Sequence, residues 1–87
     1  MAIMAIEDIF QTIRDLIAEQ FGMAQEEIQM ESTFEYDLGA DSVDLVELVM
    51  AIEEEFELGE TQEEEVRQLK TVGDAVNYVA GKLSKTE

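Results

Sequence analysis

Cysteine, histidine and proline are absent from this chain of 87 residues. Without cysteine there are no disulfides and no thiol chemistry, and without histidine the chain lacks the commonest general base and a common zinc ligand. The absence of proline argues against a turn-rich all-β fold and favours helices. The longest apolar runs are only a few residues, and the N-terminus lacks the features of a signal peptide. We therefore expect a cytoplasmic protein without membrane insertion.

Basic residues are also scarce. Five lysines and arginines stand against 22 aspartates and glutamates, which gives a formal net charge of −17. Eighteen of the acidic residues, and none of the basic ones, lie between Asp15 and Val66. Such a surface repels nucleic acid and anionic membranes, and it attracts basic surfaces of other proteins. We therefore expect protein partners with basic patches and no nucleic-acid partner.

One small domain is predicted for residues 1–87, because the length allows a single core and 46% of the residues are apolar. Apolar residues recur at helical spacing over three stretches, which cover about residues 5–20, 41–56 and 72–83. A short turn or two is expected around Val66 and Leu69, and residues 23–40 are predicted to form a long loop. The fold class is therefore all-α, a small four-helix bundle with three main helices and one short helix.

Residues that favour helix ends flank these stretches. Gly22 and Gly59 are expected to end the first and second helices, since a glycine at this place easily adopts the left-handed conformation. Asp41 with Asp44 fits an acidic capping box at the start of the second helix, and Thr71 fits an N-cap of the last one.

The second helix has two apolar faces on a helical wheel. The wider one is an ordinary core face, which consists of Leu45, Leu48, Val49, Ile52 and Phe56. A narrower stripe of Val43, Val46 and Met50 points elsewhere and is bordered by glutamates. This stripe either packs within the bundle or forms an exposed docking surface. The acidic border favours docking, because a fully buried helix does not frame its second face with carboxylates.

Motifs for catalysis or metal binding fail on spacing or composition. An EF-hand loop that starts at Asp37 or at Glu57 lacks the required glycine and the final glutamate. A serine nucleophile lacks a histidine base, and the single glycines do not match a phosphate-binding loop. Carboxylate pairs are expected by chance at this composition. We therefore expect neither an enzyme nor a metal site.

The segment Asp37-Leu38-Gly39-Ala40-Asp41-Ser42-Val43-Asp44 closely resembles the D-L-G-x-D-S-L signature of acyl carrier proteins. The similarity continues through residues 46–56 and reappears at residues 71–76. Residues 19–22 and 26–28 before the motif are also similar to the family. The resemblance therefore covers nearly the whole chain.

The resemblance implies that Ser42 carries a 4′-phosphopantetheine arm through a phosphodiester. A phosphopantetheinyl transferase installs this arm from coenzyme A. Its thiol then carries acyl groups as thioesters between the enzymes of fatty acid biosynthesis, so a chain without cysteine can take part in thiol chemistry. The position of Ser42 agrees, because free N–H groups at a helix start favour a phosphate. For the serine alone, a plain capping role is the alternative.

Two further sets of residues follow from the family's behaviour. The docking surface for partner enzymes comprises Asp41, Val43, Asp44, Val46, Glu47, Met50, Glu53 and Glu54. The family also shelters acyl chains between its helices, and the expected lining comprises Ile28, Phe34, Leu45, Leu48, Ile52, Val66, Leu69 and Val76. The lining residues can equally be the ordinary core.

The chain departs from the family's pattern after the second helix. The family often has an isoleucine–proline pair there, and the matching positions are Glu60 and Thr61. The loop is therefore either looser or anchored by Leu58 instead. Our interpretation is a stand-alone, monomeric carrier of fatty acid biosynthesis. A specialised carrier for a polyketide or another acyl pathway stays open, as does an acidic interaction protein that binds basic partners without a prosthetic group.

Overall fold

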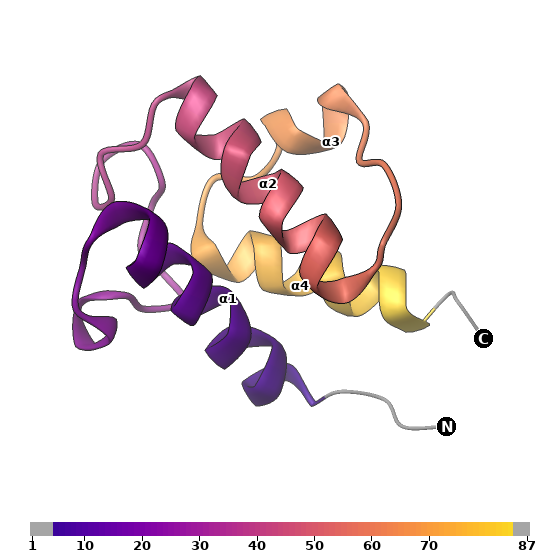
Figure 1. The fold of residues 1–87 in the computed structure, drawn as a ribbon, viewed down its shortest axis with the longest axis horizontal. Helices are drawn as coiled ribbons and strands as arrows, with labels where there is room; N and C mark the ends of the chain where they lie inside the picture. Colours follow the sequence, from indigo (N-terminus) through magenta and orange to yellow (C-terminus); the bar gives the residue numbers. More distant parts are fainter. Residues whose placement is uncertain (1–4, 85–87) are drawn as a thin grey trace.

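The computed structural model describes residues 5–84, and this part of the chain is built from helices joined by loops (Figure 1). The elements are α1 (Ile6–Phe21), the 3-10 turn η1 (Gln25–Glu27), α2 (Ser42–Phe56), α3 (Glu63–Arg67) and α4 (Val72–Ser84). Three main helices and one short helix confirm the predicted all-α class. None of the described helices has the length and apolar character needed to cross a membrane.

Helix α1 supplies one side of the core. Its buried face consists of Ile9, Ile13 and Ile17, which follow one another at the spacing of a helical turn. The helix ends where predicted, because Gly22 adopts a left-handed conformation with φ of 65° and donates its N–H to the carbonyl of Ala18.

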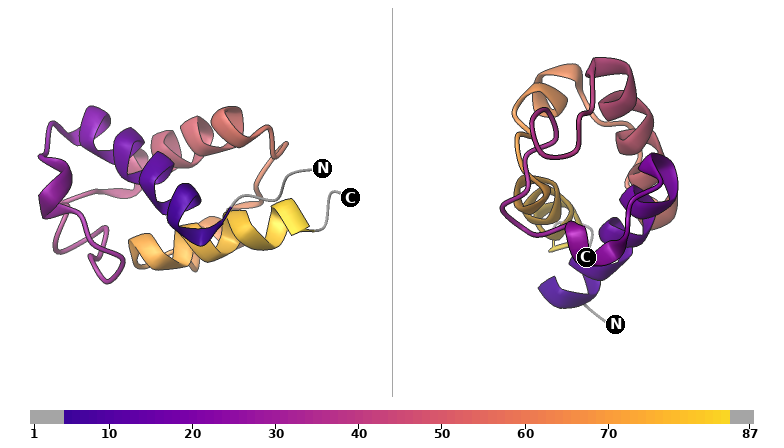
Figure 2. Two further views of the ribbon diagram at one scale, coloured as in Figure 1. Left: turned by 90° about the horizontal axis from the view of Figure 1, so that it is seen from below. Right: turned by 90° about the vertical axis from the view of Figure 1, so that its left-hand side faces the viewer.

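The core lies between α1, α2 and α4. Helix α1 packs against both α2 and α4, and α3 packs against α2. Figure 2 shows the main helices grouped around this centre, with the short α3 beside α2. The largest fully buried side chains are Ile9, Ile13, Ile17, Ile28, Leu48, Val72, Val76 and Val79.

The long loop between α1 and α2 is held to the start of α4 by backbone hydrogen bonds. They run from Phe34 N–H to the Lys70 carbonyl (2.9 Å), from Val72 N–H to the Ser32 carbonyl (2.9 Å) and from Gly73 N–H to the Met30 carbonyl (2.7 Å). The predicted bounds of the loop are therefore correct. The sequence did not indicate that its second half is fixed by hydrogen bonds to residues 70–73.

The end of α2 differs in one detail from the prediction. The helix does end at Phe56, but the left-handed residue that closes it is Glu57, with φ of 55°, and not Gly59. The N–H groups of Glu57 and Leu58 both donate to the Glu53 carbonyl. The expected role of Gly59 is wrong because a closing residue must follow the last helical turn directly. Gly59, with φ of 81°, lies further along the loop.

The α2–α3 loop is anchored rather than loose. Leu58 packs against the core, as proposed for one of the two alternatives. The N–H of Thr61 donates to Oε2 of Glu53, and the hydroxyl of Tyr78 lies 2.9 Å from Thr61 Oγ1 and 3.3 Å from Glu65 Oε1. This loop network ties α2, α3 and α4 together through polar contacts at the place where the family often has isoleucine and proline.

Helix α4 begins with a reciprocal capping arrangement. The hydroxyl of Thr71 accepts the N–H of Asp74, and Oδ2 of Asp74 accepts the N–H groups of Thr71 and Lys70. The predicted N-cap at Thr71 is therefore confirmed.

Candidate functional site

Ser42 is the first residue of α2, and Asp41 is its N-cap. Oδ1 of Asp41 accepts the N–H of Asp44 at 2.8 Å, and Oδ2 of Asp44 accepts the N–H of Asp41 at 3.2 Å. This is the predicted capping box, and it leaves the Ser42 hydroxyl out of the capping. Ser42 is exposed, and its hydroxyl has no hydrogen-bond partner within residues 5–84. The hydroxyl is therefore open to a reaction partner.

The residues before Ser42 explain the local motif in structural terms. Oδ2 of Asp37 accepts the N–H of Thr33 at 2.8 Å and so closes a turn. Gly39 has φ of 67°, a conformation that side chains disfavour. Ala40 is buried and donates its N–H to the Phe34 carbonyl at 2.8 Å. Together these contacts fix the path by which the chain enters α2.

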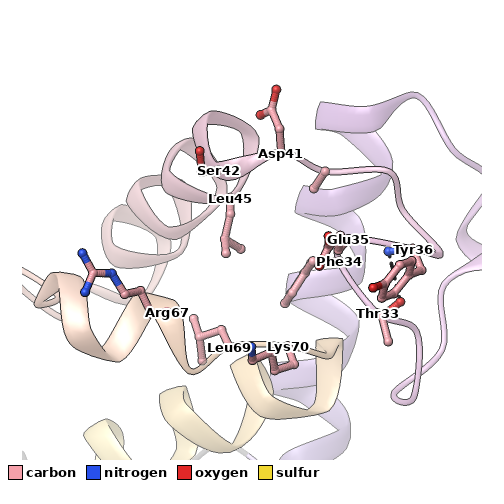
Figure 3. Close-up of a pocket in the computed structure, with 11 residues that line it drawn as sticks. Thr33, Phe34, Glu35, Tyr36, Asp41, Ser42, Leu45, Arg67, Leu69 and Lys70 are labelled. Atoms are coloured by element: carbon pink, nitrogen blue, oxygen red, sulfur yellow. Dashed lines mark hydrogen bonds between the residues drawn. The ribbon is translucent and has the colours of Figure 1, made fainter.

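Two clefts border Ser42. The smaller cleft, of about 380 Å³, lies between the start of α2 and the residues that join α3 to α4 (Figure 3). It is lined by Thr33, Phe34, Glu35, Tyr36, Ala40, Asp41, Ser42, Leu45, Arg67, Leu69 and Lys70. The larger cleft, of about 730 Å³, is lined by Ser42, Leu45, Val46, Glu60, Thr61, Gln62, Glu63, Val66 and Arg67. Both volumes fall in the range of small-molecule sites.

The eight residues expected to line an acyl pocket fall into two groups. Four of them border the clefts beside Ser42, and these are Phe34, Leu45, Val66 and Leu69. The other four lie in the closed core, and these are Ile28, Leu48, Ile52 and Val76. Leu45 belongs to both clefts and is half-buried, so it separates the open space from the core.

The narrow apolar stripe of α2 is exposed to solvent. Val43, Val46 and Met50 are 63%, 47% and 60% exposed, which is unusual for side chains of this size. The stripe therefore does not pack within residues 5–84. A hollow of about 590 Å³ continues it toward the end of α2, lined by Glu47, Met50, Ala51, Glu53, Glu54 and Gly59.

The carboxylates around this stripe are not equivalent. Asp41, Glu47 and Glu54 are exposed. Asp44 is half-buried in the capping box, and Glu53 is half-buried and holds the N–H of Thr61. Glu53 therefore stabilises the α2–α3 loop in addition to bordering the stripe.

Arg67 and Lys70 are site residues that the sequence did not indicate. Arg67 borders both clefts, and Lys70 borders the smaller one. No spacing signal could have found them, because the loop bonds bring Lys70, and the packing of α3 against α2 brings Arg67, close to the start of α2. The same holds for Tyr78, whose contact with Thr61 joins segments far apart in sequence.

Residues 11–79 match the family model described as "Phosphopantetheine attachment site". The chain belongs to the acyl carrier protein family. It is 52% identical, over 71 residues, to the acyl carrier protein of Clostridium acetobutylicum, a match that covers 82% of this chain and 91% of that relative. Its fold is similar to the solved structure of an acyl carrier protein from Enterococcus faecalis, with a TM-score of 0.74 and 29% identity. That match covers 91% of this chain and 99% of the other.

Family membership confirms three predictions. The chain is a carrier and not an enzyme, it contains a phosphopantetheine attachment domain, and its cargo is an acyl group. The start of α2 also fits a phosphate-linked group, because an exposed hydroxyl lies at the first turn of a helix and beside open clefts.

Proposed function

We propose that Ser42 is the attachment residue of 4′-phosphopantetheine and that this chain carries the acyl intermediates of fatty acid biosynthesis. The observation that carries the proposal is the division of roles at the start of α2. Asp41 caps the helix, so the hydroxyl of Ser42 stays exposed and unpaired within residues 5–84. The N–H groups of the first helical turn then favour a phosphate on this oxygen.

The attachment reaction needs coenzyme A and a phosphopantetheinyl transferase. Oγ of Ser42 forms a bond to phosphorus and loses its proton, while the nucleotide half of coenzyme A leaves. When bound, the group supplies a thiol that holds acyl chains as thioesters. The chain's own part is to hold the oxygen in place, which the capping box of Asp41 and Asp44 does.

We infer that the exposed stripe of α2 is the surface that partner enzymes bind. Its apolar centre is Val43, Val46 and Met50, and a rim of carboxylates surrounds it. The rim comprises Asp41, Asp44, Glu47, Glu53 and Glu54. Charge of one sign around an apolar centre favours fast and salt-sensitive association with a basic surface, as a shuttling carrier requires.

We also propose that the clefts beside Ser42 give acyl chains access to the apolar interior. Phe34, Leu45, Val66 and Leu69 stand between the open space and the closed core. Burial of a CH₂ group contributes about 0.8 kcal/mol, so a chain of about eight carbons gains roughly 5–6 kcal/mol in a dry site. This gain is comparable to the whole stability of a small domain, so it can offset opening of the core.

We also propose that the protein is a monomer and that it is cytoplasmic. Self-repulsion from a net charge of −17 supports the monomer, and the need for coenzyme A supports the cytoplasm. The polar residues Glu60 and Thr61, where the family often has isoleucine and proline, favour a specialised acyl pathway as the second candidate.

The attachment is tested by intact-mass measurement after incubation with coenzyme A and a broad-specificity phosphopantetheinyl transferase. We expect the wild-type chain to gain the mass of one phosphopantetheine and Ser42→Ala to gain none. A gain of mass in Ser42→Ala would mean that the group is attached to another residue. No gain in a folded, initially unmodified wild-type chain would refute the carrier role and favour an acidic interaction protein.

The docking surface is tested by the initial rate of the same modification at low salt. The double variant Glu47→Gln with Glu54→Gln should react several-fold more slowly, because the basic partner loses two attracting charges. A matched control removes two charges from η1, with Glu26→Gln and Glu27→Gln. If both variants slow equally, the effect belongs to the net charge and not to the stripe.

A further inference from the structure

Two of the chain's few basic residues lie at the smaller cleft beside Ser42. The described part of the chain holds four basic residues, namely Arg14, Arg67, Lys70 and Lys82. Figure 3 shows Arg67 and Lys70 on the segment that faces the start of α2 across the cleft, with the guanidinium group of Arg67 directed away from Lys70. In a chain with 22 acidic and five basic residues, a cleft lined by as many basic as acidic residues is locally unusual.

The charges around the two clefts favour an anion in the smaller one. The smaller cleft is lined by two acids, Glu35 and Asp41, and by the bases Arg67 and Lys70. The larger cleft is lined by two acids and only one base, Arg67. Since Ser42 borders both clefts, a negative group on its oxygen has a more favourable electrostatic environment on the side of Lys70.

Backbone contacts hold the two walls of the smaller cleft in a fixed relation. Phe34 accepts the N–H of Ala40, two residues before Ser42, and donates its own N–H to the Lys70 carbonyl. The N–H of Lys70 is in turn held by Oδ2 of Asp74, at 3.0 Å. The base of the Lys70 side chain is therefore fixed relative to the start of α2.

Both cations are available to a ligand. The only ion pair within residues 5–84 joins Arg67 to Glu63 at 3.3 Å, and both side chains are largely exposed. Such an exposed pair is weak, so the flexible side chain of Arg67 can exchange Glu63 for another anion. The ammonium group of Lys70 has no ionic partner in the described residues.

We propose that Arg67 and Lys70 form an anion subsite for the phosphodiester at Ser42 and seat the start of the arm in the smaller cleft. This inference rests on the proposed function. The subsite offsets the repulsion that Asp41 and Asp44 exert on the phosphodiester. It also directs the arm away from the exposed stripe of α2, because Val43, Val46 and Met50 do not line the smaller cleft. Partner enzymes then meet an uncovered docking surface.

The test compares the unmodified and modified forms of wild type, Lys70→Gln and Lys82→Gln. Lys82→Gln is the matched control, because Lys82 lies on α4 over the ring of Tyr78 and borders neither cleft. Intact mass first shows that each protein is modified. The melting temperature of each form and the ³¹P chemical shift of the phosphodiester are then measured at low salt and at about 0.5 M salt.

At low salt, modification should lower the melting temperature of Lys70→Gln by roughly 2–5 °C more than that of wild type or Lys82→Gln. High salt should remove this difference, and the ³¹P signal should move only in Lys70→Gln. A second, independent variant, Arg67→Gln, should give the same pattern as Lys70→Gln.

Equal effects of Lys70→Gln and Lys82→Gln would overturn the subsite and leave the carrier function intact. A wild-type chain that gains no mass would instead refute the proposed function, and the subsite with it.

Discussion

At the start of α2, capping of the helix and presentation of a free hydroxyl belong to two neighbouring residues. Asp41 accepts the N–H of Asp44 and so caps the helix, while the neighbouring Ser42 keeps an exposed hydroxyl. A serine that caps a helix uses its oxygen as an acceptor for a backbone N–H. With an aspartate in that role, the serine oxygen is left for bond formation, and the charge of Asp41 adds to the favourable interaction with the helix N-terminus.

The capping role of Asp41 predicts a measurable loss of stability on truncation. Asp41→Ala should lower the free energy of unfolding by about 1 kcal/mol, because the first turn loses its acceptor for the Asp44 N–H. Urea denaturation of the unmodified protein measures this loss. Asp41→Asn keeps an acceptor oxygen and removes the charge, so it should lose at most a few tenths of that value. Equal losses in the two variants would mean that the charge of Asp41, and not its hydrogen bond, stabilises the helix.

At this scale the sequence predicted the residues of the local motif but not those that reach it from a distance. The spacing of Asp41 and Asp44 is a capping-box signal, and it was correct. Arg67 and Lys70 give no such signal. Lys70 comes to the start of α2 through the backbone bonds of Phe34, and Arg67 through the packing of α3 against α2. Such long-range placement is set by tertiary structure and not by any local pattern.

At the scale of elements, α3 stands out as the least self-sufficient helix. It has only five residues, none of them buried, and an isolated helix of that length is not stable in water. Its position depends on the packing against α2 and on the contacts of Thr61 with Glu53 and Tyr78. Since α3 forms one side of the larger cleft, the loop network also holds that side in place.

Removal of the Tyr78 hydroxyl should loosen α3. Tyr78→Phe should lower the free energy of unfolding by about 0.5–1.5 kcal/mol, because Thr61 and Glu65 lose their partner. Hydrogen exchange should accelerate in residues 61–67 and stay unchanged in α1. Tyr36→Phe is the matched control, because Tyr36 is 82% exposed. Unchanged exchange in α3 would show that its apolar contacts alone hold it in place.

The helices themselves followed from the sequence because their buried faces repeat at a helical period. The isoleucines of α1 and the core face of α2 are regular over several turns, so the pattern is strong. The closure of α2 by Glu57 was missed, because a left-handed glutamate is rare and Gly59 stood close by. The loop network was missed because its members, Glu53, Thr61 and Tyr78, are ordinary surface residue types.

At the scale of the whole molecule, charge repulsion is the main unfavourable feature of the fold. The chain carries a net charge of −17, and within residues 5–84 only one ion pair, Arg67 with Glu63, compensates any of it. None of the acidic residues in the described part is buried, and the core is almost purely apolar, with Ser32 as the only buried polar residue within residues 5–84. Burial of the apolar core therefore has to outweigh the mutual repulsion of the surface carboxylates.

Added salt should therefore stabilise the fold. The melting temperature of the unmodified protein should rise by several degrees between about 0.01 M and 0.5 M sodium chloride, because the screening length falls from about 30 Å to a few ångströms. No group of three or more potential ligands within residues 5–84 is arranged to hold a metal ion. Magnesium and calcium chloride at equal ionic strength should hence act alike. A much larger rise with one of the two ions would reveal a specific cation site, and a flat melting temperature in sodium chloride would show that self-repulsion does not limit the stability of this chain.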